Sequence, residues 1–171
     1  MKKKSNVTIM VTAAMIAALY VVLSYISQAF GLASGAVQVR ISEALTILPA
    51  FTASAIPGLA IGCFLFNLLS GCMLMDVVVG SIATLLGAIG TYYIGRIAKK
   101  HALLPYLLPA PPIVANVLLI PPVLRFVYHL QDAYWYLLVT VGVGEVISCG
   151  ILGMILYFAV KPFRNKLASY Q

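Results

Sequence analysis

One long apolar segment constrains the fold of this chain more than any other feature. Residues 133–160 are long enough to cross a lipid bilayer, and Glu145 is their one charged residue. Because hydrocarbon offers no hydrogen bonds to the backbone, a single segment that crosses it is helical. An ionisable side chain at membrane depth is rare and costly, so Glu145 is a candidate functional residue.

The rest of the chain has the same apolar character. Its 171 residues are 63% hydrophobic and 9% charged, which is more apolar surface than a soluble protein of this length can bury. We therefore expect an all-α integral membrane protein with a single membrane domain over residues 1–171. The apolar run that begins at Val7 is too long for the hydrophobic part of a secretory signal, so we expect it to be retained as a helix.

Six membrane spans are predicted, and the distribution of basic residues supports this number. The spans cover residues 7–30, 39–53, 57–69, 76–97, 103–128 and 133–160. Joining the short second and third spans would leave five. With six, all the basic residues that flank spans one, four and six lie on one side, which the positive-inside rule makes cytoplasmic. The sequence thus predicts a six-transmembrane-helix bundle with cytoplasmic N- and C-termini. The basic residues concerned are Lys2, Lys3, Lys4, Arg96, Lys99, Lys100, Lys161, Arg164 and Lys166.

In this orientation, polar side chains gather in the outer half of the membrane. Glu145 lies 16 residues before Lys161. That separation is about 24 Å along a helix, which places Glu145 in the outer third of a core about 30 Å thick. This pattern is typical of a pocket loaded from outside. The other charged or amide side chains at the outer ends of spans are Arg40, Glu43, Asn67, Asp76 and Arg125, and Asp132 lies in the loop after Arg125.

A simpler interpretation of the outer charges stays open. Arg40, Asp76, Arg125 and Asp132 are also what ordinary interfacial charges look like, since such side chains extend toward water. Arg40 and Glu43 are three residues apart on one helix face and could simply pair.

Span one carries two overlapping pairs of alanines four residues apart. Small residues at this spacing let another helix approach closely. We expect this face to dock a separate membrane subunit, and the alternative is packing within the protein itself. The four residues are Ala13, Ala14, Ala17 and Ala18.

Several kinds of chemistry find no support in the sequence. It has no phosphate loop, no Gly-x-Ser-x-Gly elbow and no His, Glu or Asp set with metal-ligand spacing. The three cysteines form no Cys-x-x-Cys pair and are expected to pack in apolar surroundings. The basic residues lie beside apolar runs, which is typical of membrane anchoring. We therefore expect no enzyme, no metal site, no cofactor and no nucleic-acid partner.

Several motifs, in order along the chain, resemble one transporter family. These motifs are VRISEALTILP at 39–49, PGL at 57–59, NLLSG at 67–71, DVVVGSIATL at 76–85, PP at 111–112 with Asn116, and VGE at 143–145. The chain resembles the substrate-binding (S) components of energy-coupling-factor transporters, specifically the QueT family of queuosine-precursor transporters. The likeness is weakest over residues 100–109.

The resemblance implies an S component in the plasma membrane of a prokaryote. Such a component is a six-helix bundle that binds a vitamin-like solute from outside. Its partners are a transmembrane coupling subunit, two cytoplasmic ATPase subunits and membrane lipid. The implied solute is a 7-deazaguanine such as 7-aminomethyl-7-deazaguanine, or queuine. The ATPases would supply the phosphate loop, and the coupling subunit would dock on the alanine face.

The candidate residues suit this solute. A carboxylate can accept the N1–H and the exocyclic amine of a guanine edge together, and the aminomethyl cation favours a second carboxylate. Amide side chains can read the carbonyl and the ring nitrogens. The predicted substrate-binding residues are Glu145, Glu43, Asp76, Asn67, Arg40 and Asn116. An aromatic ring could stack on the ligand, and the candidates are Tyr20, Tyr25, Phe66 and Trp135.

Other functions remain open at this point. One is an S component for another vitamin-like solute. Another is a stand-alone membrane protein, either a secondary carrier driven by protonation of Glu145 or an assembly factor without a solute.

Overall fold

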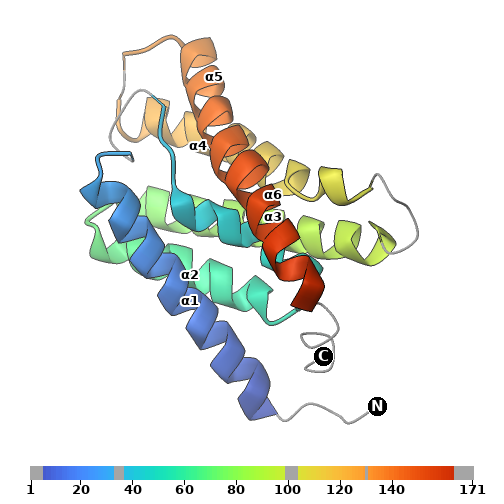
Figure 1. Cartoon of the computed structure of the whole chain (residues 1–171). Helices are drawn as coiled ribbons and strands as arrows, with labels where there is room; N and C mark the ends of the chain where they lie inside the picture. Colours follow the sequence, from blue (N-terminus) through green and yellow to red (C-terminus); the bar gives the residue numbers. More distant parts are fainter. Residues whose placement is uncertain (1–5, 33–36, 99–103, 130, 164–171) are drawn as a thin grey trace.

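All regular elements in the described part of the chain are helices. A computed structural model describes residues 6–32, 37–98, 104–129 and 131–163 (Figure 1). Within these ranges every regular element is a helix, which confirms the predicted all-α class. In chain order the elements are α1 (Asn6–Ala29), η1 (Ile41–Ala50), α2 (Ala55–Leu69), α3 (Leu74–Ile97), η3 (Leu104–Leu107), α4 (Ala110–Phe126), α5 (Tyr134–Glu145), η4 (Val146–Leu152), α6 (Gly153–Val160) and η5 (Lys161–Phe163).

Four helical segments are long and apolar enough to cross a membrane. They are Asn6–Ala29, Leu74–Ile97, Leu104–Phe126 and Tyr134–Phe163. The two remaining segments, η1 and α2, have 10 and 15 residues. Their lengths are therefore about 20 Å and about 22 Å, both less than the thickness of the hydrocarbon core. The segments predicted as spans two and three are helical but short, so six crossings remain a prediction.

The second predicted span is a 3₁₀ helix rather than an α-helix. Pro49 within η1 has no N–H to donate. Hydroxyl groups of α1 hold the start of η1: Ser27 Oγ accepts from the Ile41 N–H at 2.8 Å, and Ser24 Oγ donates to Ser42 Oγ at 2.7 Å. A ten-residue 3₁₀ run is unusual, because its hydrogen-bond geometry is poor. Tertiary contacts to α1 therefore decide the conformation of this segment.

The last long helix changes its winding in the middle. Between α5 and α6 the seven residues of η4 form a π-helix, and η4 packs against η1. Wide π turns inside α-helices are frequent at functional sites. The 3₁₀ helix η1 and the π-helix η4 therefore contact each other.

Close helix contacts depend on glycine. A Cβ atom at Gly58 would lie 2.7 Å from the Ala13 carbonyl oxygen, and one at Gly62 would lie 2.8 Å from Tyr20 Cβ. α1 and α2 therefore pack with almost no space between their backbones. A Cβ at Gly87 would likewise lie 2.6 Å from Pro112 Cα, which joins α3 closely to α4.

The bundle has a small interior and a wide apolar exterior. One core cluster joins α1, η1, α2 and α3, and it includes Tyr20, Leu45 and Leu59. A second cluster joins η1 to the end of α6 through Ile47, Phe51 and Tyr157. Large apolar side chains are exposed along the outer faces of the helices, as expected of surfaces that meet lipid. Examples are Met10, Val22, Leu118, Val139 and Ile155.

Figure 1 shows the start of α1 at the bottom of the view, the end of α3 at the right, the end of α6 between these two, and the start of α5 at the top. Arg96 lies in the last turn of α3, and Lys161 lies at the start of η5. The other basic residues used to predict the orientation lie outside the described residues. The cytoplasmic position of both termini therefore stays a prediction.

Candidate functional site

A cavity with charged side chains in its wall lies between η1 and the helices α2, α3, α4 and α5. Its empty space is about 450 Å³, counting the part of its mouth that is open to solvent. It receives side chains from η1, α2, α3, α4 and α5, together with the segment before η1. The lining residues are Gln38, Arg40, Glu43, Cys63, Gly80, Thr84, Asn116, Ile120, Val141 and Glu145.

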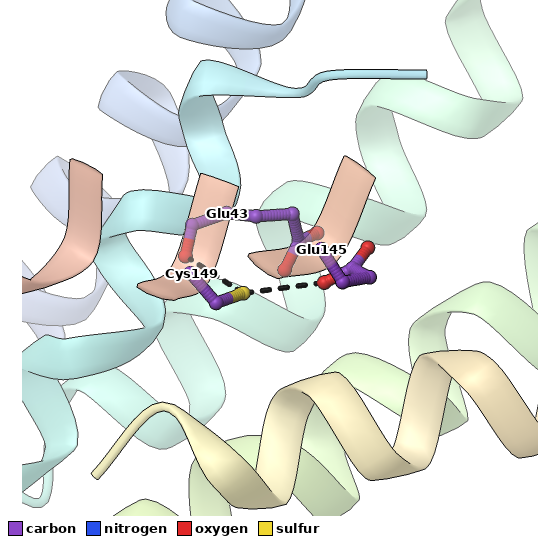
Figure 2. Close-up of side chains that lie close together, drawn as sticks. All are labelled: Glu43, Glu145 and Cys149. Atoms are coloured by element: carbon purple, nitrogen blue, oxygen red, sulfur yellow. Dashed lines mark hydrogen bonds between the residues drawn. The ribbon is translucent and has the colours of Figure 1, made fainter. Parts of the chain in front are cut away.

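Two carboxylates line this cavity, and the buried thiol of Cys149 lies beside them. Figure 2 shows Glu43 and Glu145 directed toward each other, with Cys149 beside them. Cys149 Sγ donates to Glu145 Oε2 at 3.2 Å and lies 3.6 Å from the Glu43 carbonyl oxygen. One ligand atom from each residue lies within 4.8 Å of the others. The arrangement can hold a cation or the donor groups of a polar ligand.

Contacts from α1 and η1 hold Glu43 in place. The Tyr20 hydroxyl donates to Glu43 Oε1, and Thr46 Oγ1 donates to the Glu43 carbonyl oxygen at 2.6 Å. Glu43 is 3% exposed and Tyr20 is fully buried. Since one oxygen of the carboxylate is held, the orientation of the other oxygen is also set.

The segment before η1 closes over α5 because of a glycine. A Cβ atom at Gly144 would lie 2.1 Å from the Gln38 carbonyl oxygen, so no other residue fits there without a shift. The Arg40 N–H then donates to Ser148 Oγ at 3.1 Å. These contacts bring Arg40 and Glu43 next to Glu145 although they are about a hundred residues apart in sequence.

Arg40 does not form the ion pair with Glu43 that the simpler interpretation allowed. Its guanidinium carbon lies 6.0 Å from the centre of the Phe66 ring, and no ion pair within 4.0 Å joins Arg40 to Glu43 among the described residues. Arg40 is therefore a cation at the cavity wall that leaves the carboxylates available.

Three buried polar atoms have no hydrogen-bond partner in the described chain: Glu43 Oε2, Asn116 Nδ2 and Asn67 Oδ1. Glu43 and Asn116 line the cavity. Asn67 does not, but a Cβ at the lining residue Gly80 would lie 3.0 Å from Asn67 Nδ2. Buried groups of this kind are normally paired, so these atoms leave hydrogen-bonding capacity beside the cavity for water or for a ligand.

The structure brings four of the six predicted binding residues to the cavity: Arg40, Glu43, Asn116 and Glu145. Asp76 lies elsewhere: at the start of α3 it accepts from the Tyr128 hydroxyl at 3.1 Å. Asn67 is buried behind Gly80. The structure therefore favours Glu43 over Asp76 as the carboxylate that accompanies Glu145.

None of the four stacking candidates is among the described residues that line the cavity. Tyr20 is buried beneath Glu43, and Tyr25 packs edge-on against Phe66 with ring centres 5.2 Å apart. Trp135 is 77% exposed on α5. Two of the four contact lining residues: Tyr20 donates to Glu43, and the centre of the Phe66 ring lies 6.0 Å from the Arg40 guanidinium carbon.

Several lining residues were missed by reasoning from the sequence, among them Gln38, Cys63, Gly80 and Thr84. Nothing in the sequence marked them, because small and neutral residues are common in apolar helices. Cys149 was assigned only to packing. Its spacing of four residues from Glu145 was the one available signal, since such residues share a helix face.

The alanine face of α1 divides into two parts. Ala13 and Ala17 are buried against Gly58 and Gly62 of α2, as the packing alternative predicts. Ala14 and Ala18 are exposed. A docking role therefore remains a prediction for Ala14 and Ala18, while Ala13 and Ala17 already contact α2.

Comparisons with known proteins agree on one family. A family model described as QueT transporter matches residues 10–162. The queuosine precursor transporter QueT of Lactococcus lactis subsp. cremoris (strain MG1363) is 39% identical over 83 residues, which are 48% of this chain and 48% of that protein. The aligned region thus spans about half the length of that relative. No solved structure matches the chain.

Proposed function

The chain belongs to the QueT transporter family, and from this premise we propose that it is the solute-binding S component of an energy-coupling-factor importer for a queuosine precursor. The proposed solute is a 7-deazaguanine such as 7-aminomethyl-7-deazaguanine. We place the protein in the plasma membrane of a prokaryote, where a transmembrane coupling subunit and two cytoplasmic ATPases would drive uptake.

The observation that carries this proposal is the pair of facing carboxylates in the cavity. A 7-aminomethyl-7-deazaguanine presents an amine, an N1–H, a carbonyl and an ammonium group in this order along one continuous edge. Glu145 suits the two parallel donors, and the unpaired oxygen of Glu43 suits the ammonium group. The unpaired Nδ2 of Asn116 is the donor that the carbonyl needs.

The charges of the cavity support a cationic solute. With both carboxylates ionised, Arg40, Glu43 and Glu145 together carry one negative charge. A solute with one positive charge makes the occupied cavity neutral, and buried charges are tolerated best when they are paired. Queuine also carries a secondary ammonium group at this position, whereas guanine has no cation.

Binding of four compounds to the purified protein tests the proposal. We expect the order 7-aminomethyl-7-deazaguanine, then guanine, then hypoxanthine and adenine, measured by calorimetry in detergent. Guanine lacks the ammonium group, and hypoxanthine and adenine lack the 2-amino group that a buried carboxylate requires. Equal affinity for adenine and the 7-deazaguanine contradicts recognition by carboxylates.

Transport in cells separates this function from that of a proton-coupled carrier. If the chain is an S component, uptake requires the coupling and ATPase subunits and continues after a proton uncoupler is added, as long as ATP is maintained. Uptake that stops with the uncoupler while ATP is present, or that needs no partner subunit, contradicts the proposal.

A further inference from the structure

We propose that Glu43, Glu145 and Cys149 form a binding site for a soft divalent cation of the zinc class. The relevance of this site to transport rests on the proposed function, but the site itself does not. Spacing in the sequence had given no metal site, because Glu43 lies far from the other two along the chain. Tertiary structure places one ligand atom from each within 4.8 Å of the others (Figure 2).

The distances suit a four-coordinate ion. Zinc bonds sulfur at about 2.3 Å and carboxylate oxygen at about 2.0–2.2 Å, so tetrahedral ligand atoms lie about 3.4–3.6 Å apart. Cys149 Sγ and Glu145 Oε2 are separated by 3.2 Å, close to this value. A carboxylate oxygen of Glu43 lies within 4.8 Å of both atoms and would complete a set of three protein ligands.

The surroundings of Glu43 give a second observation. The residue is 3% exposed, its Oε2 has no partner among the described residues, and the side chain lines the same cavity as Glu145. Its Oε1 is held by the Tyr20 hydroxyl. Metal-binding carboxylates typically have this form, in which an outer donor orients the group and leaves one oxygen for the ion.

The identity of the donors selects the class of ion. Calcium and magnesium take six or more oxygen ligands and do not favour sulfur. A thiolate with two carboxylates instead suits zinc or its softer analogue cadmium. Glu145 is only partly buried at the cavity, which provides a path for the ion to enter.

Binding of the metal ion releases one proton from the protein. The Cys149 thiol, which donates to Glu145, loses its proton to solvent as the sulfur–metal bond forms. Two carboxylates, one thiolate, one divalent ion and Arg40 then sum to zero charge. The occupied site is neutral, which is the condition for burying these groups.

The ion and the proposed solute would use the same carboxylates. Zinc therefore excludes a cationic solute, and it links η1 to the α5–η4 region through Glu43, Glu145 and Cys149. The protein would then take up its solute only when the site is free of metal.

Cadmium binding to the purified full-length protein tests the site without any solute. After treatment with a chelator, Cd²⁺ is titrated while the sulfur-to-cadmium charge-transfer absorption is followed in the ultraviolet. We expect a band that saturates at one equivalent, is removed by Zn²⁺ and is unaffected by the same concentration of Mg²⁺. Cys149→Ser should abolish the band, whereas the control Cys72→Ser, which changes the half-buried thiol near Ser70, should retain it.

Two results overturn the proposal: no band in the wild-type protein, or a band that persists in Cys149→Ser. If Cys149→Ser does not fold, Glu145→Gln serves instead. This isosteric change at the cavity should weaken Cd²⁺ binding by at least about tenfold, and unchanged affinity refutes the site. Because no 7-deazaguanine is present, this titration can fail while the proposed function holds, and the reverse is also true.

Discussion

Glu43 has an unusual position for a carboxylate in an apolar bundle. It is 3% exposed, yet one of its oxygens has no partner in the described structure. An unpaired buried polar group costs about 1–3 kcal/mol. Tyr20, Thr46 and the contacts of η1 with α1 hold the residue there despite this cost. A bound ligand that pairs with this oxygen removes the cost, so the oxygen contributes to both the affinity and the specificity of binding.

The first prediction concerns Glu145. Glu145→Gln should weaken binding of 7-aminomethyl-7-deazaguanine by at least about tenfold, because a hydrogen bond to a charged group is worth about 1.5–3 kcal/mol. Calorimetry on the purified variant measures the change. Asp132→Asn is the control, since Asp132 is exposed and its carbonyl oxygen, which accepts from Arg125 Nη1, is retained. A Glu145→Gln variant that folds and binds like the wild type would refute the role.

A second prediction concerns the cavity wall at Gly80. The added Cβ of Gly80→Ala would lie 3.0 Å from Asn67 Nδ2 and occupy part of the lining. We expect solute affinity to fall about tenfold while thermal stability holds or rises, since Ala favours a helix over Gly by about 1 kcal/mol. Gly142→Ala in α5 is the matched control, because its Cβ meets only Val117 Cγ2 at an ordinary 3.6 Å. Equal affinities of the two variants contradict a role for Gly80 in the size of the cavity.

At the scale of elements, α1 uses its two alanine pairs differently. The pair Ala13 and Ala17 faces the glycines of α2, where close contact supplies packing energy within the subunit. The pair Ala14 and Ala18 is exposed. One helix thus has an internal contact and a free small-residue face side by side.

This division gives a third prediction, tested by the same substitution at adjacent residues. Ala13→Leu should lower the unfolding temperature of the isolated subunit, because overpacking costs about 1–3 kcal/mol. Ala14→Leu should leave folding and solute binding unchanged but abolish transport and co-purification with the coupling subunit. If Ala14→Leu co-purifies normally and transports, the exposed face is not the docking surface.

The 3₁₀ helix η1 and the π-helix η4 also act together. The 3₁₀ helix η1 carries Glu43 and the π-helix η4 carries Cys149, and the two pack together beside Glu145. In regular α-helices the side chains of Glu43 and Cys149 would point in other directions. The candidate binding side chains therefore lie where the helix geometry is least regular, as is common at functional sites.

At the scale of the whole molecule, orientation in the membrane is the main open feature. The fourth prediction is that both termini lie in the cytoplasm. A reporter that is active only in the cytoplasm should be active when fused to either terminus, and a reporter that is active only outside should be inactive there. The reason is that basic residues flank both ends of the chain. A reporter fused within the loop near Asp132 is the control and should report the outer side. Termini on opposite sides would mean that η1 and α2 do not each cross the membrane.

Much of the fold could be predicted from the sequence because it depends on local properties. The length of an apolar run and the absence of charge within it indicate a membrane helix wherever it packs. The helical class and the approximate positions of the helices were therefore accessible. So was the family, and so were Arg40, Glu43, Asn116 and Glu145 as candidates, because an unusual residue in apolar surroundings is visible without a structure.

What the tertiary structure alone decided is which distant residues meet. Glu43 and Glu145 share a cavity because Gly144 lets the segment before η1 cross α5, a contact that no local pattern encodes. The same packing leaves Asp76 with Tyr128, turns Ala13 inward and makes span two a 3₁₀ helix. Such outcomes depend on the fit between helices, whereas the periodicity of one helix does not identify its neighbours.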